Sequence, residues 1–217
     1  MPLTAIFGDV HLGAEGCLEE EFKEALRSIA EKMDLILFNG DFLDSYNQEA
    51  RDILDDFLVW VEKEGWKEKM VFITSGMGHE GNILYDRPEI QLLPYATLQT
   101  SEGAIIICHG HNIGLLKRAG ETWREAIRHL KESLVWKENS AFPKINSTDK
   151  LIISHTHVPI YDMETGVFAT GAWIRKDRKN LREQVRNDRL IGVFIIVDDE
   201  NRGDPIQMKR WLLQKNL

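Results

Sequence analysis

The amino-acid sequence predicts an α/β fold built on a largely parallel sheet. In the first half, apolar strand-like segments at residues 3–7, 35–38 and 70–74 alternate with two segments of helical periodicity. This alternation is typical of parallel strands that are joined by helical crossovers. The central run, Leu35 to Phe38, is uniformly apolar and stops at Asn39-Gly40, as expected for a strand that is buried on both faces.

The two predicted helices of the first half place their apolar side chains on one face. The first segment begins with acidic residues, which favour a helix N-terminus, and its apolar positions are Phe22, Ala25, Leu26, Ile29 and Met33. The second segment carries Ile53, Phe57, Leu58 and Val61 and closes at Gly65. We therefore expect helices from Glu19 to Met33 and between the second and third strands.

The second half is richer in predicted β structure. Strands are expected at 104–108 and 151–153, around 160–163 and 167–169, and in a terminal hairpin formed by 192–197 and 205–212. One further helix is expected at 122–137, with apolar residues on one face. Because several of these strands follow one another closely, they can pair antiparallel.

Length and composition favour one domain covering residues 1–217. An apolar fraction of 43% supports a sizeable core and argues against disorder. The two cysteines, Cys17 and Cys108, make no disulfide framework, which suits a reducing compartment. The start has no basic segment typical of a signal peptide, and no apolar run is long enough to span a bilayer. We therefore expect a cytoplasmic protein without a membrane span.

The net charge of −8 disfavours sequence-independent binding of nucleic acid, which depends on neutralising phosphates. It does not exclude a local basic patch. The segment 175–189 holds seven basic residues against three acids. This segment is expected either to be a solvated surface or to supply an arginine that binds a substrate phosphate, with Arg175 as the first candidate. The oligomeric state is left open.

Polar clusters follow five of the predicted strands. They are Asp9/His11, Asp41/Asp44, His79/Glu80, His109/His111 and His155/His157. In an extended segment, residues i and i+2 point to the same face, so such pairs can aim at one point. Carboxylates and imidazoles are the ligand set of divalent metals such as Mn, Fe and Zn. The clusters offer more ligands than one tetrahedral ion needs, whereas two ions that share a carboxylate would use them all.

This order of motifs resembles the calcineurin-like metallophosphoesterases. The resemblance runs from Asp9 to Pro159 and extends weakly to Thr170-Gly171-Ala172-Trp173. It implies a four-layer α/β/β/α sandwich of two mixed sheets flanked by helices. It also implies hydrolysis of a phosphomonoester or phosphodiester at a dinuclear metal centre by a metal-bound hydroxide. Two divalent ions would be the cofactors, with Mn expected first and Fe, Zn or Ni as alternatives. The acidic net charge favours a small-molecule or nucleotide substrate.

The resemblance also implies a ligand for each position of the metal centre. Asp9, His11 and His157 would hold one ion, and His109 and His155 would hold the second. Asp41 would bridge the two ions. Asp44 would orient a ligand imidazole, although it could instead cap the helix that follows.

The third motif departs from the family pattern. The family has Asn before the histidine that helps to protonate the leaving group, whereas here Gly78 precedes His79. Either the second ion lacks this ligand, or His79 or Asn82 supplies it. His79 is the candidate catalytic residue, yet both His79 and His111 could be solvated loop histidines. The altered motif also supports an alternative function, a weakly active or inactive binding scaffold such as the retromer subunit that has this fold.

Overall fold

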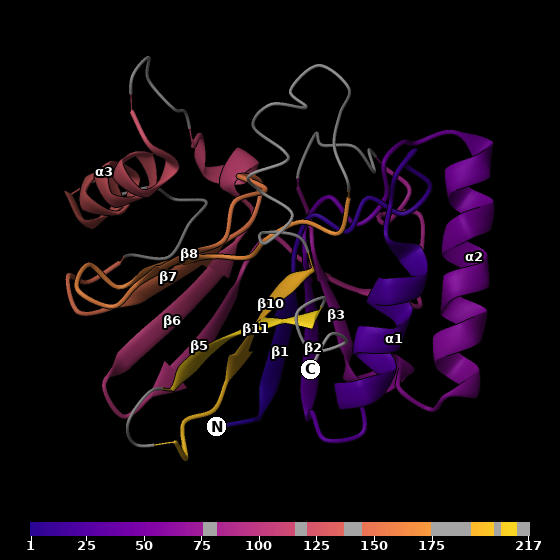
Figure 1. The fold of residues 1–217 in the computed structure, drawn as a ribbon, viewed down its shortest axis with the longest axis horizontal. Coiled ribbons are helices and arrows are strands. Elements are labelled where there is room, and N and C mark those ends of the chain that lie inside the picture. Colours follow the sequence, from indigo (N-terminus) through magenta and orange to yellow (C-terminus); the bar gives the residue numbers. More distant parts are fainter. Residues whose placement is uncertain (76–81, 116–120, 137–144, 175–191, 202–204, 212–217) are drawn as a thin grey trace.

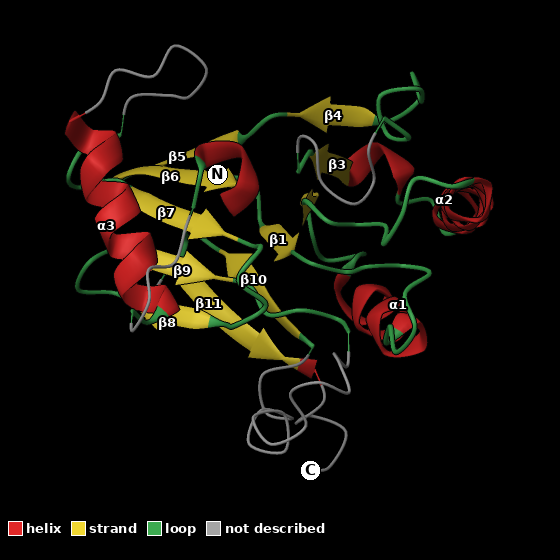
Figure 2. Cartoon of the chain, turned by 90° about the horizontal axis from the view of Figure 1, so that it is seen from above, coloured by secondary structure: helices red, strands yellow, loops and turns green. Residues whose placement is uncertain are grey.

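In the computed structural model, two β-sheets face each other and helices cover their outer faces (Figure 1). The structure describes residues 1–75, 82–115, 121–136, 145–174, 192–201 and 205–211. Seen from above, α1 (Glu19–Ile29) and α2 (Gln48–Lys63) lie outside one sheet and α3 (Trp123–Trp136) lies outside the other (Figure 2). The predicted four-layer α/β/β/α sandwich of two mixed sheets is therefore confirmed.

The first sheet has six strands in the order β11-β10-β1-β2-β3-β4. Their bounds are β1 Thr4–Phe7, β2 Leu35–Asn39, β3 Met70–Ile73, β4 Gln91–Leu93, β10 Val193–Val197 and β11 Ile206–Arg210. The strands β1 to β4 run parallel, β10 pairs antiparallel with β1, and β11 pairs antiparallel with β10. The predicted terminal hairpin is thus confirmed, and it extends the parallel sheet at one edge.

The second sheet has five strands in the order β5-β6-β7-β9-β8. Their bounds are β5 Ala96–Thr100, β6 Gly103–Cys108, β7 Lys150–Ile153, β8 Ile160–Asp162 and β9 Val167–Ala169. The strands β6, β7 and β9 are parallel, while β5 and β8 form antiparallel edges. Short 3₁₀ helices follow α2 at Lys67–Lys69 and β6 at Gly110–Ile113.

Three apolar layers hold the sandwich together. One lies between the first sheet and α1 and α2, and it includes an aromatic cluster in which Phe7, Phe22 and Trp173 contact one another. The second layer joins the two sheets through side chains such as Leu37 and Ile107. The third packs α3 on the second sheet. Burial of these layers excludes water from the sheet interiors and fixes where the strand ends lie.

Several boundaries differ from the sequence-based expectation. The first helix ends at Ile29 rather than Met33, and β2 continues through Asn39. The strands β4 and β5 were not predicted. In β5 only Leu98 is buried, because this edge strand has little contact with the core, so its apolar pattern is weak. Within the described residues, none of the helices combines the length and the apolar character that a membrane crossing requires.

Candidate metal centre

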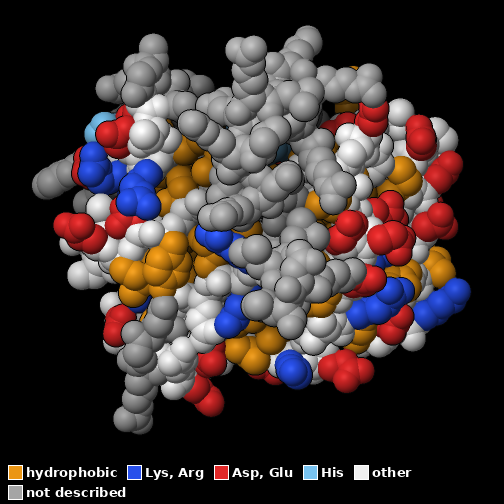
Figure 3. Space-filling view, viewed as in Figure 1, with side chains coloured by type: hydrophobic (Ala, Val, Ile, Leu, Met, Phe, Trp, Pro, Cys, Tyr) orange, Lys and Arg blue, Asp and Glu red, His pale blue; other side chains and the backbone are white. Residues whose placement is uncertain are grey.

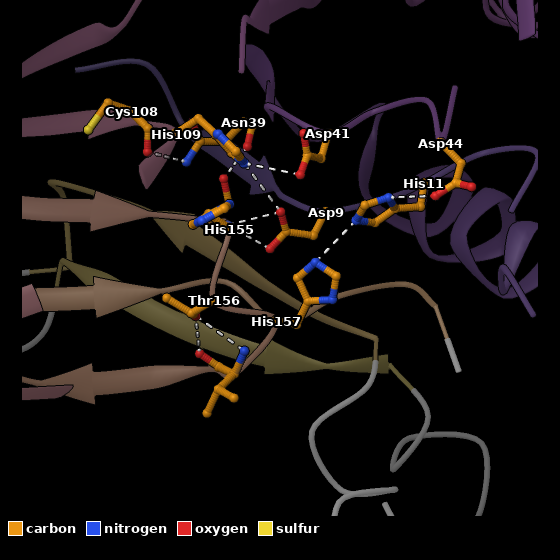
Figure 4. A network of polar contacts seen from close by, with 12 residues as sticks. Asp9, His11, Asn39, Asp41, Asp44, Cys108, His109, His155, Thr156 and His157 are labelled. Atoms are coloured by element: carbon orange, nitrogen blue, oxygen red, sulfur yellow. Dashed lines mark hydrogen bonds and ion pairs between the residues drawn. The ribbon is translucent and has the colours of Figure 1, made fainter. Parts of the chain in front are cut away.

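The six residues predicted as metal ligands come together where four parallel strands end (Figure 4). Asp9 and His11 follow β1, and Asp41 follows β2 in the same sheet. His109 follows β6, and the last two, His155 and His157, follow β7 in the other sheet. The site therefore lies at the carboxyl edge of both sheets, where parallel α/β sheets place their binding crevices.

The side chains form two groups that share one carboxylate. Asp9, His11, Asp41 and His157 make the first group, and Asp41, His109 and His155 make the second. Within each group, one nitrogen or oxygen atom of every residue lies within 4.8 Å of the others. Two ligand bonds of 2.0–2.2 Å on opposite sides of an ion span about 4 Å, so each group needs only a small contraction to hold a divalent ion.

In the first group, His11 is held from both sides of its ring. Its Nε2 lies 3.2 Å from Nε2 of His157, and its Nδ1 lies 3.2 Å from Oδ1 of Asp44. A carboxylate on Nδ1 favours the tautomer that leaves Nε2 as a lone pair directed at the centre of the group. The alternative role of Asp44 as a helix cap is wrong, because Asn47 caps α2 by accepting a hydrogen bond from the Ala50 N–H.

In the second group, His109 is fully buried between two carboxylates. Its Nε2 lies 3.4 Å from Oδ2 of Asp41 and 3.6 Å from Oδ1 of Asp9. Neither ring nitrogen of His109 makes a hydrogen bond within the part of the chain that the structure describes. Both oxygens of Asp9 accept the backbone N–H of His155, at 2.9 and 2.8 Å.

The electrostatic balance reflects this crowding. Burial lowers the pKa of His109, but its contacts with Asp41 and Asp9 outweigh burial and raise the pKa to about 9. Burial alone would raise the pKa of Asp9, yet the close contact with the His109 ring and the charges of His157 and His109 lower it. Burial, followed by the charge of His109, lowers the pKa of His155. Carboxylates in a buried site favour positive charge nearby, and the raised pKa of His109 reflects this.

The backbone at the site adopts a conformation that side chains rarely take. Among the described residues other than glycine, five have positive φ angles: Asp9 at 50°, His11 at 53°, Asp41 at 44°, His155 at 79° and His157 at 56°. All five belong to the two groups. The left-handed conformation costs such residues on the order of 1–3 kcal/mol each and is typically found where function requires a particular side-chain direction.

The two groups fit divalent cations on this structural evidence alone. Their donors are carboxylate oxygens and imidazole nitrogens, which suit Mn, Fe and Zn. The Nε2 atoms of His11 and His157 face each other at 3.2 Å, and the buried ring of His109 has no hydrogen-bond partner among the described residues. A cation in each group would satisfy these atoms and neutralise the buried carboxylates.

The structure does not bring every predicted site residue into these groups. His79 and Arg175 lie outside the described residues, so their roles stay predictions. Asn82 is exposed, and its carbonyl accepts the N–H of Asp86 in a turn. His111 is also exposed and belongs to neither group, although its ring centroid lies 5.6 Å from that of His155.

Sequence reasoning missed a buried polar network directly behind the site. The side chain of Asn39 donates from Nδ2 to the Cys108 carbonyl at 3.0 Å, and the Ser154 hydroxyl donates to the Asn39 carbonyl. All three residues are fully buried. The signal in the sequence is a polar residue at the end of an apolar strand, directly before a motif, as in Asn39 before Gly40-Asp41.

The fold and site together define a two-sheet α/β protein with a candidate metal centre at its parallel strand ends. The family model of the calcineurin-like phosphoesterases matches residues 3–181, and the chain belongs to this family. This match covers all six residues of the two groups. A comparison with the curated proteins gives no match.

Solved structures that resemble this chain come from bacteria and from a eukaryote. A Thermotoga maritima protein solved by solution NMR is 14% identical with a TM-score of 0.52, and covers 97% of this chain and 99% of its own. The phosphoesterase YfcE from E. coli is 13% identical with a TM-score of 0.50, at 95% and 98% coverage. Vacuolar protein sorting 29 from Cryptosporidium parvum is 15% identical with a TM-score of 0.49, at 95% and 96% coverage. At these identities the likeness to the first two structures shows the fold alone.

Proposed function

We propose that this chain is a metal-dependent phosphoesterase that uses two divalent ions. The observation that carries the proposal is the pair of largely buried ligand groups that share Asp41. Asp9, His11, Asp41 and His157 would hold one ion, and Asp41, His109 and His155 would hold the other. A shared carboxylate is the means by which two ions are kept close enough to act on one phosphoryl group, at about 3.5–4 Å.

When bound, such ions supply Lewis-acid polarisation of the phosphoryl oxygens and activation of a water molecule. The chain's own residues fix where that chemistry takes place. Asp44 orients the ring of His11 through Nδ1, and the His155 N–H holds both oxygens of Asp9. These contacts keep the donors in place before substrate arrives, which lowers the reorganisation that the reaction requires. Mn is proposed as the first choice of metal.

A small phosphorylated substrate, such as a phosphomonoester, phosphodiester or nucleotide, is proposed. Acidic side chains predominate over the side of the molecule formed by α1 and α2 (Figure 3), and the chain has a net charge of −8, so a long polyanion would be repelled. His79 is proposed as the acid that protonates the leaving group, and Arg175 as a residue that binds a substrate phosphate. A cytoplasmic location is part of the same proposal.

The test combines metal analysis with an activity screen. The chain is stripped with EDTA, reconstituted with Mn, Ni, Zn or Mg, and assayed with p-nitrophenyl phosphate and bis-p-nitrophenyl phosphate. We expect two ions per chain and metal-dependent hydrolysis of at least one substrate. Asp41→Asn, which removes the charge shared by both groups, should abolish turnover while the chain remains folded by circular dichroism.

Two results would contradict the proposal. One is a chain that binds no ions, and the other is an Asp41→Asn variant that hydrolyses the best substrate at the parent rate. A third outcome, two ions bound without hydrolysis of any monoester or diester, would favour the alternative of a binding scaffold, which the change at Gly78 also supports.

A further inference from the structure

The buried network of Asn39, Cys108 and Ser154 lies directly upstream of the second ligand group. Asn39 stands two residues before Asp41, Cys108 one residue before His109, and Ser154 one residue before His155. Each ligand of the second group thus follows one member of the network within two residues along the chain. In the first group, by contrast, the ring of His11 contacts the Asp44 carboxylate and the ring of His157.

The network joins three strands from both sheets. Asn39 is the last residue of β2 in the first sheet, and Cys108 is the last residue of β6 in the second. Ser154 directly follows β7. The two hydrogen bonds therefore cross from one sheet to the other at the edge where the site is built. Figure 4 shows the one between Asn39 and Cys108. Backbone pairing cannot make this connection, because the strands that carry the ligands belong to different sheets.

Tight packing at the same level leaves little freedom for the ligand loops. A Cβ atom on Gly40 would lie 2.6 Å from Cγ of the His109 ring, so the β2 loop lies directly against that imidazole. At the end of β1, a Cβ atom on Gly8 would lie 2.6 Å from Cβ of Ser154. A shift of β2 against β6 or β7 would therefore change the spacing between Asp41 and the two histidines of the second group.

We propose that Asn39 is a positioning residue, which acts together with Ser154 to hold Asp41, His109 and His155 at the spacing that one ion requires. The inference rests on the proposed function in that it assigns the second group to an ion. Hydrogen bonds in a buried, low-dielectric layer are strong and directional. They are therefore suited to fixing the position of the β2 end relative to the ends of β6 and β7. Neither Asn39 nor Ser154 is a member of the ligand groups themselves.

The test uses two variants and a control on the same strand. Asn39→Leu keeps a similar size but removes the donor to Cys108, and Ser154→Ala removes the donor to the Asn39 carbonyl. Leu37→Val is the control, because Leu37 lies two residues earlier on the same face of β2 and packs between the sheets without a polar contact. All variants are compared with the parent in urea denaturation, so that loss of stability is measured separately.

The first readout needs no metal. In the EDTA-treated chain, the ring resonances of His109 and His155 should shift or broaden in Asn39→Leu and Ser154→Ala, while those of His11 and His157 stay in place. In Leu37→Val all four should resemble the parent. The inference is overturned if the His109 and His155 signals are unchanged in both variants, or if Leu37→Val moves them equally.

The second readout is titration with Mn²⁺ alone. We expect both network variants to bind one of the two ions at least tenfold more weakly and to leave the other within about twofold of the parent. Loss of affinity for both ions alike, or parent-like affinity for both, contradicts the positioning role. If the parent itself binds no Mn²⁺, the proposed function fails, and the histidine resonances still decide whether Asn39 and Ser154 position the second group.

Discussion

At the scale of single residues, Gly40 has a steric role that can be tested. Its φ of +71° and the nearness of the His109 ring leave no room for a side chain. Gly40→Ala should displace His109 and remove one of the two proposed ions, as measured by metal content after reconstitution. Gly65→Ala is the matched control, since Gly65 has a φ of +77° but no atom within 4 Å of an added Cβ. Two ions retained in Gly40→Ala would contradict this reading.

Asp44 offers a second prediction at this scale. It contacts His11 Nδ1 at 3.2 Å without belonging to either ligand group. Removing a carboxylate that orients a metal-binding imidazole typically weakens binding about 10–100-fold. Asp44→Ala should therefore lower the affinity for one of the proposed ions by this factor in an Mn²⁺ titration. The affinity for the other should stay nearly unchanged. Asp86→Ala, which removes an exposed ion pair with Arg51, should change neither.

At the scale of elements, the stability of α2 depends on its N-cap residue and not on the metal-ligand groups. The side chain of Asn47 accepts the Ala50 N–H at 2.9 Å and satisfies an otherwise unpaired donor of the first turn. Asn47→Ala should lower the free energy of unfolding by about 1 kcal/mol in urea denaturation. Metal content should stay at the parent value, because Asn47 contacts none of the ligand residues. Gln48→Ala, an exposed change one residue later, should cost less.

At the scale of the whole molecule, His109 couples the stability of the metal-free chain to pH. Its folded pKa of about 9 lies above the ordinary value of 6.5. The protonated ring therefore stabilises the fold fully below pH 6.5, and this contribution is lost as the pH rises through about 9. Urea denaturation of the EDTA-treated chain should show falling stability across this range.

His109→Gln provides the control for this dependence, because glutamine does not titrate. The variant should show a flatter stability profile between pH 6.5 and about 9. An equally steep profile in the variant would assign the dependence to other groups. Since a metal needs the neutral imidazole, Mn²⁺ affinity should rise with pH over the same range.

Much of the site could be predicted because its information is local. Each candidate ligand lies within four residues of the end of an apolar run, so the sequence indicates both the chemical type of the side chain and its place at a strand end. The parallel alternation of the first half then predicts that Asp9, His11 and Asp41 meet at one edge. The family resemblance extended this to the second half and to the four-layer sandwich, which the structure confirms.

The sequence by itself thus determined the fold class and the set of donor side chains, whereas the tertiary structure alone decided how they are held. The left-handed backbone at five candidate ligands and the links among Asn39, Cys108 and Ser154 are not readable from local pattern. These features depend on how two sheets pack against each other. Contacts between residues far apart in the chain follow from that packing, which no single segment's propensity specifies.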